Sequence, residues 1–147
     1  MIDQKRAMLR HMLATVGFRG QIAVADAAAG FADFRVCETA RTPGEILAHI
    51  GDLIYGSHFL LKGEMVMLNS EPLSWKEETD RFFSGIRELD AFLAGDVELA
   101  FPVEKFIQGP IGDALTHVGQ IVILRRIFGS PISEQQYFQA EIIPGKI

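Results

Sequence analysis

Apolar residues recur at helical spacing in four stretches of the chain, which predicts four helices that each bury one face. The first stretch begins at Asp3 and runs to about Val16. Its predicted buried side consists of Met8, Leu9, Met12, Leu13 and Val16. A continuation through residues 21–29 stays open, because Gly17 and Gly20 would each cost about 1 kcal/mol relative to alanine in a helix interior. We expect Phe31, Phe34 and Val36 to form a loop over the end of the bundle.

The second and third helices each begin at a capping box, in which a hydroxyl residue is followed three positions later by glutamate. The two pairs are Thr42 with Glu45 and Ser74 with Glu77. The predicted buried residues are Ile46, Leu47, Ile50, Leu53, Ile54, Leu60 and Leu61 in the second helix, which ends at Gly63, and Phe82, Ile86, Leu89 and Leu93 in the third, which ends at Gly95.

The last helix is predicted to start at Gly109 and Pro110 and to end at Gly129, after an irregular or briefly extended connection over residues 97–106. Its apolar stripe contains Ile121, Leu124, Ile127 and Phe128. Asp113 and His117 fall on the same stripe, four residues apart and therefore adjacent on one helix face. A carboxylate and an imidazole that both point inward need a partner.

A second histidine can join this pair from the second helix. His49 borders the apolar face of that helix, whereas His58 lies half a revolution further round, so a straight helix cannot direct both at one site. The helical pattern alone leaves both candidates open, and it places His11 on a solvated face. Two imidazoles and one carboxylate are typical ligands of a divalent metal, Zn or Ni first, with Fe or Mn also suitable. The alternative is a buried Asp-His hydrogen bond without metal.

Length and charge limit the classes of protein to which this chain can belong. The chain has 147 residues, of which 48% are hydrophobic, and this suits a single domain. Its net charge of −5 argues against a nucleic-acid partner. The charged N-terminal segment lacks the features of a signal peptide, and no apolar run approaches the roughly 20 residues of a membrane span, so we expect a cytoplasmic protein without membrane contact. Cys37 is the single cysteine, which excludes an internal disulfide.

Residues 132–147 form a tail that is unusually apolar for a chain end. It contains Tyr137, Phe138, Ile142 and Ile143, which would leave a large apolar patch if they stayed in water. We therefore expect the tail to dock on its own bundle or on a second subunit.

Three motifs together resemble the DinB-like (YfiT-like) family of metal-binding four-helix-bundle proteins. They are RTPGEILAHIGD around His49, PLSW at the start of the third helix, and QGPIGDALTHVGQIVILRRIFGSP around Asp113 and His117. The resemblance covers nearly the whole chain and implies one all-α domain over residues 1–147, a homodimer, and His49, Asp113 and His117 as metal ligands. It thus selects His49 over His58. The commoner family pattern has histidine where this chain has Asp113, which leaves the metal identity and any inherited activity open.

The resemblance further implies a metal-dependent thiol transferase, in which a low-molecular-weight thiol attacks a small electrophile. A metal at this site could also activate water. A second hypothesis is a non-catalytic dimeric bundle that binds metal or a small apolar ligand as a sensor or scaffold. Gln120, one turn after His117, is a candidate for contact with a ligand residue or with substrate.

Overall fold

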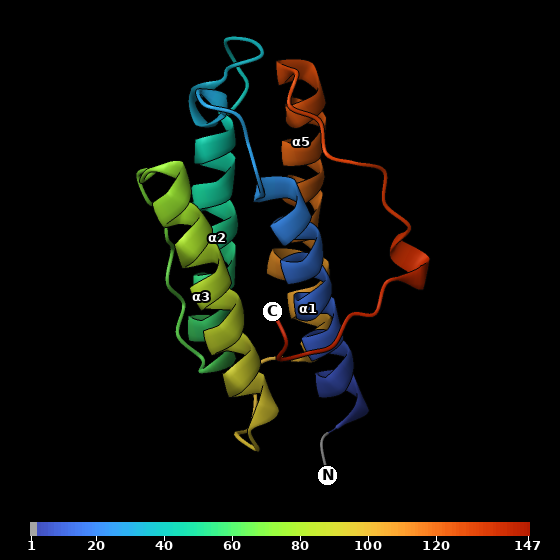
Figure 1. Ribbon diagram of the computed structural model, residues 1–147. Coiled ribbons are helices and arrows are strands. Elements are labelled where there is room, and N and C mark those ends of the chain that lie inside the picture. Colours follow the sequence, from blue (N-terminus) through green and yellow to red (C-terminus); the bar gives the residue numbers. More distant parts are fainter. Residues whose placement is uncertain (1–2) are drawn as a thin grey trace.

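Four long helices pack side by side in the computed structural model, which describes residues 3–147 (Figure 1). They are α1 (Gln4–Val24), α2 (Pro43–Leu61), α3 (Trp75–Ala94) and α5 (Gly112–Phe128). Shorter helical segments are η1 (Phe31–Asp33), α4 (Val103–Phe106), η2 (Ile107–Ile111) and η3 (Tyr137–Gln139). The predicted all-α arrangement of four packed helices is confirmed.

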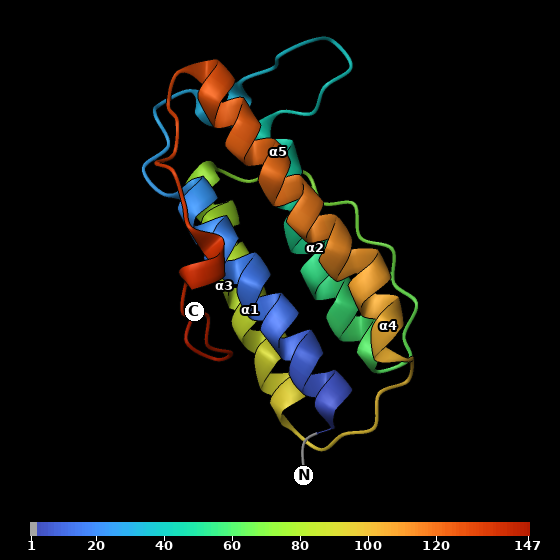
Figure 2. The ribbon, with the colours of Figure 1, turned by 90° about the vertical axis from the view of Figure 1, so that its right-hand side faces the viewer.

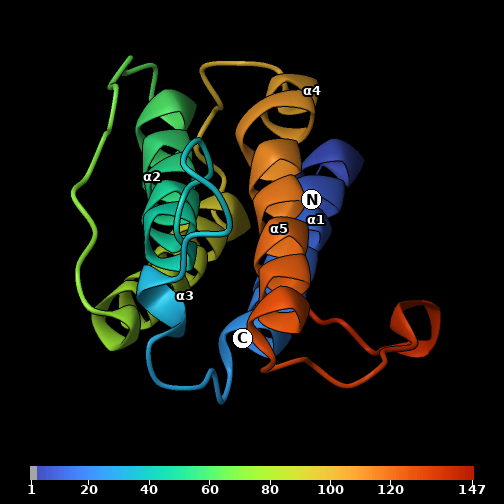
Figure 3. The same ribbon diagram turned by 90° about the horizontal axis from the view of Figure 1, so that it is seen from above.

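The helices alternate around the bundle so that α1 and α2 each contact both α3 and α5 (Figure 3). Figure 2 shows that α1 and α5 run in one direction and that α2 and α3 run in the other. Because α2 and α3 are parallel, the connecting residues 62–74 must return along the length of α2 before α3 can begin. We call this segment the crossover. It forms one wall of a cavity of about 800 Å³.

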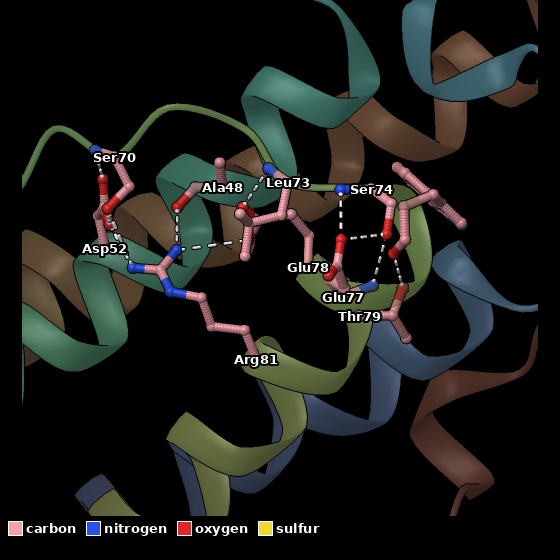
Figure 4. A network of polar contacts seen from close by, with 10 residues as sticks. Ala48, Asp52, Ser70, Leu73, Ser74, Glu77, Glu78, Thr79 and Arg81 are labelled. Carbon is pink, nitrogen blue, oxygen red and sulfur yellow. Dashed lines mark hydrogen bonds and ion pairs between the residues drawn. The ribbon is translucent and has the colours of Figure 1, made fainter.

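A network of charged hydrogen bonds fixes the crossover to the bundle (Figure 4). The carboxylate of Asp52 accepts hydrogen bonds from the backbone N–H of Ser70 at 2.8 Å and from its hydroxyl at 2.7 Å. The same carboxylate accepts from the guanidinium of Arg81 on α3, which also donates to the carbonyl of Ala48 at 3.1 Å. Buried Glu78 accepts from the N–H of Leu73 at 3.0 Å. The crossover is thereby held at two points, one to α2 and one to α3.

The helix starts of α2 and α3 agree with the sequence, because both predicted capping boxes are formed. The first helix continues past Gly17 and Gly20 to Val24. A Cβ atom at Gly20 would overlap the ring of Phe82, and one at Gly17 would lie 2.8 Å from the side chain of Ile147. These two glycines therefore allow neighbouring side chains to pack against the helix backbone rather than interrupting the helix.

The predicted start of the last helix at Gly109 and Pro110 coincides with a break, because the backbone of Gly109 is not helical (φ −103°, ψ −112°). A short helix that was not predicted, α4, precedes this break from Val103. Proline has no N–H to donate, so Pro110 fits the first turn of the helix that follows the break. Residues 103–106, predicted as irregular or extended, are helical because Val103 and Phe106 are buried in the core.

The core lies between the four helices, but two residues assigned to it from the sequence lie outside. Met8 is 56% exposed and Ile127 is 53% exposed. The buried face of α5 consists of Ala114, Val118, Ile121, Leu124 and Arg125. Arg125 belongs to it because its guanidinium donates to the carbonyls of Ala23 at 2.9 Å and Ala25 at 2.8 Å, where α1 ends. Because the buried face of α5 includes an arginine, the spacing of apolar residues alone placed the predicted stripe differently from the observed buried face.

The two segments that were predicted to pack on the bundle, the loop around residues 31–36 and the tail, do so only in part. Phe31 is buried against Trp75 and Phe128, with ring centroids 5.4 and 5.6 Å away, as expected for a covering loop, whereas Val36 is 45% exposed. In the tail, Tyr137 lies under the guanidinium of Arg19 at 3.9 Å. Phe138 is fully exposed.

No helix within residues 3–147 is long and apolar enough to cross a membrane.

Candidate metal centre

The three predicted ligand residues come together where α2 faces α5. His49 Nε2 lies 3.6 Å from Asp113 Oδ2, and His117 Nε2 lies 3.4 Å from Asp113 Oδ1. The two imidazole rings are nearly perpendicular, with centroids 4.8 Å apart. Asp113 and His117 are adjacent because they are separated by one helical turn, and the packing of α2 on α5 adds His49. One ligand atom from each residue lies within 4.8 Å of the other two.

These distances fit a shared metal ion better than direct hydrogen bonds. An N–H···O hydrogen bond in a protein spans about 2.7 to 3.2 Å, and both histidine-to-carboxylate distances exceed this range. Two ligands held about 2.1 Å from a tetrahedral ion are separated by about 3.4 Å. Two imidazole nitrogens and a carboxylate oxygen form a donor set that suits Zn and several other divalent metals.

The orientation of His117 is set by Gln120, the neighbour that the sequence suggested. His117 Nδ1 lies 2.7 Å from the amide oxygen of Gln120. The amide oxygen of Gln120 accepts a hydrogen bond from Nδ1–H, and in this tautomer of the neutral ring the lone pair of Nε2 faces Asp113 and is available to a metal. Such a hydrogen bond to the outer ring nitrogen is typical of metal-bound histidine.

The surroundings of His49 also favour the neutral imidazole that metal binding requires. Burial lowers the pKa of His49, and the nearby charges of Arg41 and His117 lower it further, against the opposing effect of the Asp113 carboxylate. At neutral pH His49 therefore offers a free lone pair.

The centre lies at the rim of the core and is open to solvent. The exposed fraction of the side chain rises from 13% for His117 through 30% for His49 to 49% for Asp113. The expectation that Asp113 points into the core is therefore wrong. His58 lies apart from the cluster and packs against the ring of Phe92, with centroids 5.1 Å apart. His11 is exposed, as predicted.

Three hollows meet at the centre, and their polarity differs. A groove of about 800 Å³ extends from His49 and Asp113 along α2, and six of its other 13 lining residues have apolar side chains. A polar hollow of about 340 Å³ lies on the other side of His49 and is lined by Arg41, Asn69 and Ser70 among others. A third, of about 400 Å³, adjoins His117 and Gln120. Sequence reasoning missed Arg41, which directly precedes the N-cap of α2, and the crossover residues, because only the folded paths of these two segments bring them to the centre.

Comparison of the chain with protein-family models, with curated proteins and with solved structures gives no match. The resemblance to the DinB-like family therefore stays a prediction from the three motifs, and the functional argument depends on the geometry of the centre.

Proposed function

We propose that this protein binds one divalent metal ion through His49, Asp113 and His117, and that it is a metal-dependent thiol transferase of the DinB-like type. The observation that carries the metal site is the pair of histidine-to-carboxylate distances, 3.4 and 3.6 Å, too long for hydrogen bonds and suited to ligands of one ion. Zn and Ni are the first candidates, and Fe or Mn also accept this donor set.

A metal at this centre would supply Lewis acidity, which lowers the pKa of a bound thiol so that thiolate is present at neutral pH. Two neutral imidazoles and one carboxylate compensate only one of the two positive charges of the ion, which favours an anionic further ligand. In the transfer, the S–H proton passes to solvent water, sulfur forms a bond to the electrophilic carbon, and the leaving group departs with the electron pair of its bond. Asp113, half exposed at the rim, leaves room for this exchange.

The hollows on either side of His49 support a reaction with two substrates. The polar hollow offers the guanidinium of Arg41 and the amide of Asn69, which suit the polar groups of a small thiol. The groove offers apolar walls, which suit the body of an electrophile. His49 lines both hollows and so lies at the place where the two reactants would meet.

The test combines metal content with thiol consumption. Wild-type protein purified with Zn or Ni should hold about one metal ion per chain and should accelerate the loss of cysteine thiol in the presence of 1-chloro-2,4-dinitrobenzene. His49→Ala and His117→Ala should lose both properties, while the matched controls His58→Ala and His11→Ala should keep them. Bound metal without turnover across small thiols would favour the non-catalytic sensor or scaffold. Metal-free wild-type protein, unaffected in stability by added metal, would overturn the site.

A further inference from the structure

Gly56 lies in the interior of α2 without a packing reason within the described part of the chain. A Cβ atom added there would meet no atom within 4 Å. Gly51, on the same helix, differs, because its Cβ would lie 2.6 Å from the guanidinium of Arg81. A glycine in a helix interior costs about 1 kcal/mol relative to alanine. The space that Gly56 leaves belongs to the 800 Å³ groove, which this glycine lines.

The groove has a polar end, and apolar side chains line much of its length. His49 and Asp113 form the polar end, and Leu53, Leu60, Val66, Met67, Leu68 and Pro110 line the rest together with small or polar residues. From His49 to Leu60 the helix rises by about 16 Å. A second apolar hollow of about 280 Å³, which includes Phe101 and Phe106, shares Leu60 and Pro110 with the groove and extends it.

Segments of the fold itself supply both walls of the groove. One wall is helical, supplied by α2 and by the kinked segment at Gly109 and Pro110. The other wall is the crossover, which the Asp52 carboxylate holds through Ser70. Met67 on this wall is 95% exposed, so the wall presents an apolar side chain to water. A cavity of this size and lining is typical of a small-molecule site.

We infer that the groove binds an elongated apolar substrate chain, with its reactive head at His49 and Asp113 and its chain running over Gly56 toward Leu60. The position of the head rests on the proposed function, whereas the position of the chain rests on the groove alone. The electrophile of this protein would therefore belong to the class of alkyl or alkenyl compounds with a long unbranched chain.

The probes are butyrohydroxamate and octanohydroxamate, which share a metal-chelating head and differ by four methylene groups. Burying one methylene group completely strengthens binding about fourfold. A groove that is open on one side should give about half of that binding free energy, which corresponds to about twofold per methylene. Calorimetry on the metal-loaded full chain should therefore find octanohydroxamate bound about 15-fold more tightly. Gly56 lies about 10 Å along the helix from His49, beyond the reach of the shorter probe.

Gly56→Leu places a side chain in the groove at a position where the Cβ meets no atom within 4 Å, and it should weaken octanohydroxamate at least about tenfold while changing butyrohydroxamate less than about twofold. Gly119→Leu is the matched control, because Gly119 lies in α5 on an exposed face, meets no atom within 4 Å, and lies outside the groove. It should leave both affinities unchanged.

Equal affinities for the two probes in wild-type protein, or an octanohydroxamate affinity insensitive to Gly56→Leu, would overturn the chain site while leaving the metal centre intact. If the protein holds no metal, the proposed function fails, and 1-octanol then decides the groove by itself. If wild-type protein binds octanol and Gly56→Leu weakens this binding, the result supports the chain site. An octanol affinity that the substitution leaves unchanged rejects the chain site.

Discussion

Asp113 is the residue at which the metal centre and a hydrogen-bonded Asp-His pair make opposite predictions. Replacement by histidine keeps three metal ligands, so Asp113→His should retain about one metal ion per chain, with a changed preference among metals. In a hydrogen-bonded pair the same change would bring three imidazoles together without an anion and should destabilise the fold by about 1 to 3 kcal/mol. Elemental analysis and melting temperatures with and without chelator distinguish the two.

The control for this substitution is Asp113→Ala, which removes a ligand without adding another. It should lower metal content, and the protein should still fold because the Asp113 side chain is 49% exposed. If Asp113→His lost its metal while Asp113→Ala kept it, the carboxylate would not be a ligand.

The helical repeat was enough to predict Asp113 and His117 as a pair, since residues four apart on a helix are neighbours whatever surrounds them. It could not choose between His49 and His58, because that choice depends on which face of α2 meets α5. The kink at Gly109 and the burial of Arg125 also depend on tertiary contacts. Arg125 is buried because the carbonyls of Ala23 and Ala25 are there to accept its hydrogen bonds.

At the scale of helices, both capping boxes were predictable because they involve only neighbouring residues. The continuation of α1 through Gly17 and Gly20 was not, because propensity opposes it and packing against Phe82 and Ile147 decides it. The same limit applies to α4, whose four residues are helical because two of them reach the core.

Two glycine substitutions should change helix stability in opposite directions. Gly20→Ala places a methyl group against the ring of Phe82 and should destabilise the protein by about 1 to 3 kcal/mol. Gly56→Ala removes the helix penalty of glycine in open space and should stabilise it by up to about 1 kcal/mol. Denaturant unfolding of both variants beside wild type measures the two changes. A stabilised Gly20→Ala variant would refute the packing argument for α1.

For the whole molecule, the exposed side chain of Phe138 supports the proposal that the tail docks on the second subunit of a homodimer. Covering one phenylalanine contributes roughly 1.5 to 3 kcal/mol, and a two-fold interface would do so twice. Light scattering at micromolar concentration should find a dimer, and Phe138→Glu should shift it toward monomer. Met65→Glu is the control, since Met65 is 79% exposed on the crossover. A monomeric wild-type protein would refute the proposal.

The stability of the whole fold should depend on pH through Asp52, the carboxylate that holds the crossover. Burial by itself would raise the pKa of Asp52, but hydrogen bonds from Ser70 and the charge of Arg81 outweigh it, so the pKa is lower than in the unfolded chain. The contribution of Asp52 is then fully present above the unfolded pKa of about 3.9 and is lost as pH falls through the depressed folded pKa.

Asp52→Asn removes this charge and leaves Arg81 without its carboxylate partner on α2. At pH 7 the variant should unfold with about 1 to 3 kcal/mol less free energy than wild type, and the difference should shrink as pH falls below about 4. Urea unfolding at several pH values measures both. Asp80→Asn is the matched control, because Asp80 forms an exposed ion pair with Lys76 and should contribute little at any pH. If the difference in unfolding free energy between Asp52→Asn and wild type did not change with pH, packing rather than the charge of Asp52 would hold the crossover against the bundle.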